Sequence, residues 1–338
     1  MRGVGLSLPN RGLLFEAITV AEMLELAERA DSSGHFGSVW VGDGLIAKAR
    51  VESVTSLAAI AARTSRVRLG VCCLATFPLR QPVLFACQWA SLDVLSGGRT
   101  LLAVCTGATT ARSGGAVATE LAAMDVEGRE RVPRLEEAIA VLRGLWAGPF
   151  AHEGRFWSFP EVDLEPKPVQ DECPIWIASN PDPGRLSPER YQAAIDRVGR
   201  LADGWMSTVV TPEDFGARWA EVRAAAERLG RDPTRLRSAV HLMVNVADDE
   251  RTARAEAKRF LDTYYSMDVD DETMDRWGAF GPPEQVLERL AAYVDQGLDV
   301  PIVRFASFDQ TAQMDRASEL LLPGLAGLCR DEPAVAAS

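Results

Sequence analysis

Two consecutive apolar runs of the chain end in residues that could do chemistry. The first run ends at Cys72 and Cys73, and the second passes through Cys105 into Thr106 and Gly107. Thiols, a hydroxyl and the backbone N–H groups of a glycine loop can all contact a ligand. Ligands of parallel α/β folds bind at the C-terminal ends of the strands. We therefore expect a ligand site where these two runs end.

The same residues belong to one predicted strand–helix–strand crossover. Val67–Leu74 and Leu101–Cys105 are short and apolar, which is typical of strands buried on both faces. Pro82–Leu95 lies between them and carries its apolar residues on roughly one side, so it predicts a helix. Ser96-Gly97-Gly98 follows and suits the C-terminal turn of that helix.

Polar residues also follow two other predicted strands. Asp43 and Gly44 come after one strand, and Ser179 and Asn180 come directly after Pro174–Ala178. A hydroxyl, an amide and backbone N–H groups in a loop that leads to a helix suit an anion. An ordinary proline-rich turn accounts for the same residues, so both interpretations stay open.

The histidines and cysteines give no sign of a metal site. The three histidines (35, 152 and 241) are scattered, and the six cysteines have no metal-type spacing. His241 lies in an apolar run and is interpreted as a core imidazole with its hydrogen bonds satisfied. We expect reduced thiols, no metal and a cytoplasmic protein.

Strand and helix patterns alternate along the whole chain, which predicts an α/β fold with eight strand–helix units. Eight units are the count of a TIM (β/α)8 barrel. A doubly wound open sheet is the alternative, although it rarely needs eight parallel strands in one domain. The predicted strands end at Leu8, Val41, Leu74, Cys105, Ala178, Ser207, Val246 and Phe305.

We expect one domain over residues 1–338, with insertions after strands four and seven. The segment 109–130 begins rich in Gly, Ala and Thr, and it is a candidate lid. The segment 149–173 predicts a small hairpin closed by proline. The segment 266–281 is acidic and then aromatic, and it is interpreted as a loop between two helices and as a second candidate lid.

Composition excludes several classes of partner. The formal net charge of −12 argues against nucleic acid, because phosphates are neutralised by basic surfaces. No apolar run approaches the roughly 20 residues of a membrane span. The first residues, MRGVGLSLPN, predict a strand and not a signal peptide. We expect a small-molecule substrate and neither a nucleic acid nor a membrane as partner.

Several motifs together give the chain a family resemblance. It resembles the bacterial-luciferase-like flavin monooxygenases over most of its length, through the order and spacing of short motifs that are weak singly. These motifs are VWVGD (39–43), RLGV (68–71), LDVLSGGR (92–99), RLEEA (134–138), HEGRFW (152–157), PKPVQ (166–170), PIWI (174–177) and LADGW (201–205). The resemblance implies a TIM barrel that holds reduced FMN or the deazaflavin F420 at its C-terminal mouth.

The resemblance also implies roles for the thiols. Cys72-Cys73 falls where the family carries a non-prolyl cis peptide behind the isoalloxazine ring, although two small apolar residues in a strand explain the composition equally well. Cys105 falls where bacterial luciferase has a thiol close to the flavin. Thr106 and Gly107 would then present amides to the cofactor. A buried, inert cysteine is the alternative for Cys105, and no catalytic residue is assigned.

Ser179 and Asn180 match the phosphate-binding turn of the FMN-using members. The insertion that follows them is longer than in the family, so Arg185 is a further candidate for a phosphate contact. Asp43 is counted with the cofactor site. It either contacts the cofactor or has a structural role, in which it caps or orients the loop. Gly44 departs from the family pattern, because many F420-dependent dehydrogenases have a histidine there as general acid or base. Glycine cannot transfer a proton.

On this basis the resemblance implies a two-component monooxygenase. Reduced FMN would come from a separate flavin reductase, and O₂ would oxygenate a small organic substrate within a homodimeric enzyme. An F420H₂-dependent reductase or dehydrogenase on the same fold is the first alternative. A non-catalytic flavin-binding homologue is the second.

Overall fold

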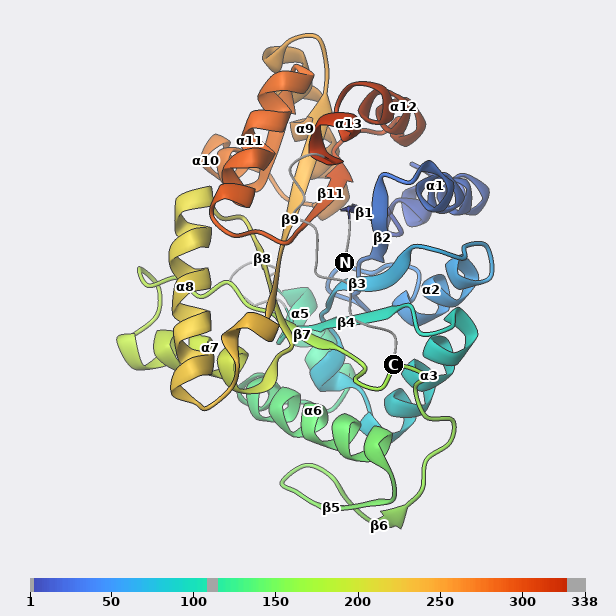
Figure 1. Cartoon of the computed structure of the whole chain (residues 1–338), viewed down its shortest axis with the longest axis vertical. Coiled ribbons are helices and arrows are strands. Elements are labelled where there is room, and N and C mark those ends of the chain that lie inside the picture. Colours follow the sequence, from blue (N-terminus) through green and yellow to red (C-terminus); the bar gives the residue numbers. More distant parts are fainter. Residues whose placement is uncertain (1–2, 108–114, 327–338) are drawn as a thin grey trace.

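The computed structural model describes residues 3–107 and 115–326. Within them, eight parallel strands form a closed ring in the order β1-β2-β3-β4-β7-β8-β9-β11, and β11 pairs again with β1. Helices cover the outside of this ring (Figure 1). The predicted TIM barrel is therefore confirmed. Its strands are β1 (Val4–Ser7), β2 (Phe36–Val41), β3 (Arg68–Leu74), β4 (Thr100–Val104), β7 (Ile175–Ala178), β8 (Gly204–Thr208), β9 (Arg237–Val246) and β11 (Val300–Phe305).

The helices begin and end at residues with suitable caps. Thr19 and Glu22 form a capping box at the start of α1, and Gln81 caps α3 ahead of Pro82. Gly97 ends α3 in the left-handed conformation, with φ of 67°. The helices are α1 (Val20–Ser33), α2 (Ser53–Ala61), α3 (Pro82–Ser96), α5 (Gly115–Ala123), α6 (Arg131–Ala147), α7 (Pro188–Leu201), α8 (Pro212–Arg228), α9 (Glu250–Tyr265), α10 (Asp271–Trp277), α11 (Pro283–Asp295), α12 (Gln310–Leu320) and α13 (Leu322–Ala326). Among the described residues, no helix is both long and apolar enough to cross a membrane.

The three predicted insertions have different outcomes. The hairpin within 149–173 is present as antiparallel β5 (Phe150–Glu153) and β6 (Ser158–Val162), and it projects from the body beneath α6 (Figure 1). Residues 115–123 of the candidate lid form α5, whereas 109–114 lie outside the described residues. Whether the segment closes over a site stays a prediction.

The interpretation of 266–281 as a loop is wrong. Residues 271–277 form α10, and β10 (Gly278–Gly281) pairs in parallel with β9 outside the ring. Asp270 caps α10 through the backbone N–H of Thr273. Helix α10 has only seven residues and strand β10 only four, so neither is long enough to show a clear apolar periodicity. A pattern search needs such a period to separate an element from a loop.

We call the end of the ring where the strands finish the mouth, and the end where they start the floor. The apolar core inside the ring includes Trp40, Leu101, Trp176, Ala239 and Ile302.

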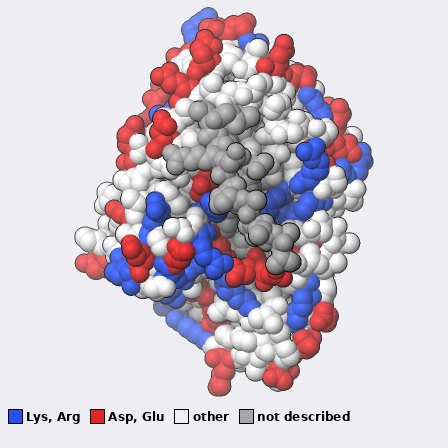
Figure 2. Space-filling view, viewed as in Figure 1, with Lys and Arg blue, Asp and Glu red and all other residues white. Residues whose placement is uncertain are grey.

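Figure 2 shows acidic side chains gathered along the upper edge of one face, where α10 and α11 lie.

Candidate active site

A layer of polar side chains lies above the apolar core of the barrel, toward the mouth. Alternate residues of a strand point to the same side, so His241 continues the face of Ala239, and Arg304 that of Ile302. The same alternation adds one residue from each of four other strands. We call this set the polar layer; its members are Ser7, Cys72, Cys105, Thr208, His241 and Arg304.

The predicted thiols meet at the ends of β3 and β4. The Cys72–Cys73 peptide bond is cis, as predicted. The Sγ of Cys73 lies 2.7 Å from the Sγ of Cys105, whereas the Sγ of Cys72 lies 3.4 Å from the hydroxyl of Ser7. The two neighbouring cysteines therefore contact different strands.

Gly107 lies two residues after Cys105, at a position that has no room for a side chain. Its φ is 78°, and a Cβ there would lie 2.8 Å from the carbonyl oxygen of Ala75. The carbonyl of Thr106 accepts a hydrogen bond of 3.0 Å from Arg131. The loop after β4 therefore runs close against the loop after β3.

Asp43 organises the loops around the mouth. One oxygen of its carboxylate accepts from the backbone N–H and the hydroxyl of Thr76, at 2.8 and 2.7 Å. The other accepts from Ser53 at 2.9 Å and from Arg80 at 3.3 Å. Its oxygens are thus engaged by protein groups, which favours the orienting role. Direct contact between Asp43 and a cofactor stays a prediction.

Arg304 was not singled out in the sequence, yet it is the most unusual residue of the mouth. It is 1% exposed, and it donates to Tyr265 Oη at 3.2 Å, to Ser7 Oγ at 2.7 Å and to the carbonyl of Leu8 at 3.2 Å. Its Nε has no partner, and it forms no ion pair within the described residues. Buried charges are normally paired. One charged residue in the apolar run VPIVRF was the sequence signal for it.

Two more arginines contact Tyr264, whose ring also faces the guanidinium of Arg304. Arg50 donates to Tyr264 Oη at 3.2 Å and to the carbonyl of Asp43 at 3.1 Å. The guanidinium of Arg11 donates to the carbonyl of Ala49 and to the hydroxyl of Ser266. In the described parts of the chain, neither arginine forms an ion pair. Arg11, Arg50 and Arg304 thus bring to the mouth three positive charges that no carboxylate of the described residues pairs.

His241 is only partly what the sequence predicted. It is buried, but its Nε2 has no hydrogen-bond partner among the described residues. Burial, with the nearby charges of Arg304 and Arg50, holds the pKa of His241 well below its ordinary value. The imidazole is therefore neutral at pH 7. Burial likewise raises the pKa values of Cys72 and Tyr265, so both groups keep their protons.

The Ser179-Asn180 turn lies beside a cation that the sequence did not reveal. The side-chain oxygen of Asn180 accepts a 2.6 Å hydrogen bond from Arg218 of α8, which is 7% exposed. The Asn180 amide donates to the carbonyl of Thr208 at 2.7 Å. Arg185 is instead exposed and lies 3.2 Å from Asp182. Arg218, and not Arg185, is thus the buried positive charge at this turn, although phosphate binding there stays a prediction.

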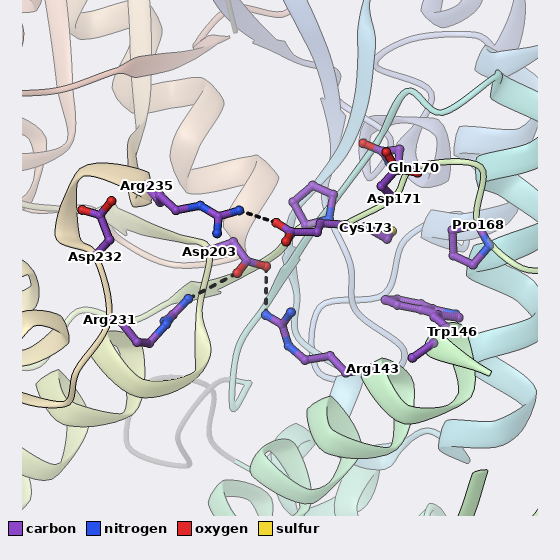
Figure 3. A pocket seen from close by; sticks show the side chains of 13 residues that line it. Arg143, Trp146, Pro168, Gln170, Asp171, Cys173, Asp203, Arg231, Asp232 and Arg235 are labelled. Carbon is purple, nitrogen blue, oxygen red and sulfur yellow. Dashed lines mark hydrogen bonds and ion pairs between the residues drawn. The ribbon is translucent and has the colours of Figure 1, made fainter. Parts of the chain in front are cut away.

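A cavity of about 510 Å³ lies at the other end of the barrel (Figure 3). Its lining includes residues just before β7, β8 and β9, which places it at the floor. Asp203 there contacts Arg143 at 2.9 Å and Arg231 at 3.4 Å, and Arg235 contacts Glu172 at 2.6 Å. The three arginines that line this cavity are thus each paired with a carboxylate. Catalytic sites of such barrels lie at the mouth, so we do not assign the cavity to the active site.

Comparison with known proteins agrees with the barrel fold. An F420-dependent hydroxymycolic acid dehydrogenase of Mycobacterium tuberculosis is 29% identical over 313 residues, which cover 90% of this chain and 79% of that one. The oxygenase component of a flavin-dependent trigonelline monooxygenase of Acinetobacter baylyi is 29% identical over 161 residues, 47% of this chain and 42% of that one. A solved F420-dependent secondary alcohol dehydrogenase has a TM-score of 0.78 at 20% identity and covers 98% of this chain and 100% of its own. Residues 3–300 match the sequence model of the luciferase-like monooxygenases, and the chain belongs to that family of oxidoreductases.

Proposed function

We propose that this protein is an F420-dependent oxidoreductase that reduces a small organic substrate such as an enone or an imine. The observation that carries the proposal is the extent of the similarity. The F420-dependent relative matches 90% of this chain, whereas the flavin-dependent monooxygenase matches 47%. This choice reverses the order of the two cofactors that the sequence alone favoured.

The mouth has features that fit an anionic cofactor with a flat ring. Gly107 leaves the loop after β4 without a side chain, next to Cys73 and Cys105. Arg218 supplies a buried positive charge beside Ser179, and no ion pair occupies it within the described residues. We assign the ring to the ends of β3 and β4 and the phosphate to the Ser179 turn. When bound, F420 supplies the hydride chemistry, and the protein supplies position and protons.

The protons at the mouth favour reduction over alcohol oxidation. Alcohol oxidation needs a base near the hydroxyl. At Gly44 a Cβ would lie 2.4 Å from the carbonyl of Lys48, so the loop leaves no room for a histidine there. His241 is neutral, but its surroundings disfavour the cation that it would become. Cys72 Sγ and Tyr265 Oη instead hold protons that a reduced substrate could take.

Binding and turnover with each cofactor test the proposal. Purified protein is titrated separately with F420 and FMN, and F420H₂ oxidation is followed with a panel of enones and imines. We expect F420 to bind at least tenfold more tightly than FMN, and at least one acceptor to oxidise F420H₂. Tighter binding of FMN, together with substrate-dependent O₂ uptake from reduced FMN, would overturn it.

A monooxygenase that uses reduced FMN and O₂ is the second candidate. The specific observation in its favour is the Ser179 turn with Arg218, which suits the terminal phosphate of FMN. The chain has no G-x-G-x-x-G motif after a strand for NAD(P)H, so a separate reductase would supply the reduced flavin. The same titration separates the two candidates.

A further inference from the structure

Two thiols at the mouth are close enough to bond. The Sγ atoms of Cys73 and Cys105 are 2.7 Å apart, and a disulfide bond measures about 2.05 Å. The strand ends that carry them already pair, because Leu74 faces Val104 and the N–H of Cys105 donates to the carbonyl of Leu74. Both side chains are only partly buried, so a small oxidant can reach them.

The other described cysteines lack this arrangement. Cys72 faces the hydroxyl of Ser7, and Cys173 lies 3.8 Å from the hydroxyl of Thr100. Cys87 lies 3.9 Å from the carbonyl oxygen of Glu165. Within the described residues, only Cys73 and Cys105 bring sulfur against sulfur.

We propose that Cys73 and Cys105 form a reversible disulfide at the mouth of the barrel, made by hydrogen peroxide and opened by a dithiol. The two thiols and one peroxide molecule give one disulfide and two molecules of water. The sulfur of one cysteine attacks a peroxide oxygen, the O–O bond breaks, and a sulfenic acid and the first water form. The second thiol then displaces the sulfenic oxygen, which leaves as the second water, and the S–S bond forms.

The surroundings of the pair assign a role to each sulfur. The neighbouring Cys105 thiol and burial raise the pKa of Cys73 well above its ordinary value, so Cys73 is the poorer nucleophile. The guanidinium of Arg131 donates to the carbonyl of Thr106, the residue that follows Cys105. Cys105 therefore meets the peroxide, and Cys73 resolves the sulfenic acid.

The disulfide would fasten the ends of β3 and β4 together at the place assigned to the cofactor ring. The inference depends on the two sulfur atoms and not on which cofactor the barrel holds. It can therefore succeed where the proposed function fails, and the reverse also holds.

Thiol labelling of the full-length protein tests the inference. The reduced protein is exposed to hydrogen peroxide, denatured and alkylated, and its mass is measured. The chain has six cysteines, so the oxidised protein should take up two labels fewer than the reduced protein. A tryptic digest should contain a cross-linked pair made of peptides 69–80 and 100–112. Dithiothreitol should restore all labels.

Variants identify the sulfur atoms involved. Cys73→Ser and Cys105→Ser should each abolish the cross-link, whereas Cys72→Ser, the matched control on the neighbouring residue, should keep it. Full labelling after peroxide, addition of oxygen without a cross-link, or a bond inside peptide 69–80 would overturn the inference.

Thermal unfolding gives a second, independent measurement. A cross-link between residues 73 and 105 restricts the unfolded chain, so oxidation should raise Tm by about 5 °C. The rise should disappear in Cys105→Ser. An unchanged or lowered Tm of the oxidised wild-type protein would contradict a bond that fits the native geometry.

Discussion

The floor and the mouth of the barrel differ in how fully their arginines are hydrogen-bonded. At the floor, Arg99 uses its guanidinium to donate to the carbonyls of Ser96, Val67, Ala61 and Thr64 and to the Thr64 hydroxyl. At the mouth, Arg304 keeps an unpartnered Nε and no acidic partner within the described residues. Satisfied polar networks stabilise a fold, whereas unsatisfied ones cost stability. The difference indicates that the floor serves stability and the mouth serves binding.

The largest expected effect is on the floor network of Asp93. This fully buried carboxylate accepts from the Thr100 hydroxyl at 2.6 Å, from the Gln170 amide at 2.7 Å and from the Val169 N–H at 2.8 Å. Asp93→Ala would leave these donors unpaired and should lower the free energy of unfolding by about 4 kcal/mol. Urea denaturation measures this loss, and Asp93→Asn, which keeps one acceptor, should lose less.

The affinity of the folded Asp93→Ala protein for its cofactor should stay within a factor of two of wild type. A stability loss below about 1 kcal/mol, or a large loss of affinity in the folded variant, would contradict the division between floor and mouth.

The two arginines provide a matched pair for the second prediction. Arg99→Met should lower the free energy of unfolding by about 3 kcal/mol, because several carbonyls lose their donor. Arg304→Met should cost only about 1 kcal/mol, because removing an unpaired buried cation offsets the lost hydrogen bonds. Turnover or cofactor affinity should fall at least tenfold in Arg304→Met only. Equal stability losses, with binding kept in both variants, would remove the distinction.

The barrel and its strand ends could be predicted from the sequence, and most side-chain contacts at the mouth and at the floor could not. Each predicted strand end lies within one residue of the observed one, because strands buried on both faces are continuous apolar runs. Arg218 stood in an amphipathic helix, where a cation normally faces solvent. The contact between Cys73 and Cys105 depends on which neighbouring strand each side chain faces, and no spacing of residues specifies that.

The third prediction concerns the charge at the Ser179 turn. Ser179→Asp places a carboxylate where a cofactor phosphate is proposed, and like charges repel at such a site. Affinity for F420 or FMN should fall at least tenfold, which is about 1.4 kcal/mol, whereas affinity for riboflavin should change little. Fluorescence titration measures each affinity.

Two arginine variants serve as partner and control for this turn. Arg218→Gln should reproduce the loss of affinity, whereas Arg185→Gln should change nothing, because Arg185 is exposed and faces Asp182. Equal losses for riboflavin would mean that the turn shapes the pocket without contacting phosphate.

The smallest expected effect is a difference in how the two ends respond to acid. The pKa of His241 is lowered in the folded protein, mainly by burial, so below pH 6.5 the unfolded chain binds a proton that the folded chain does not. Stability should therefore fall from about pH 6.5 downward, by up to about 1.4 kcal/mol per pH unit, until the folded pKa is reached.

At the floor, Asp31 should respond only at lower pH. Burial alone would raise its pKa, but hydrogen bonds from the backbone N–H groups of Val67, Ser65 and Arg66 outweigh burial and lower it. This carboxylate stabilises the fold above its unfolded pKa of 3.8 and loses that contribution as pH falls further. Urea denaturation between pH 7 and pH 3 should then show the His241 step first. His241→Gln should remove only the upper step and Asp31→Asn only the lower one. If His241→Gln leaves the upper step in place, the neutral imidazole is not its source, and the mouth would resist acid as well as the floor does.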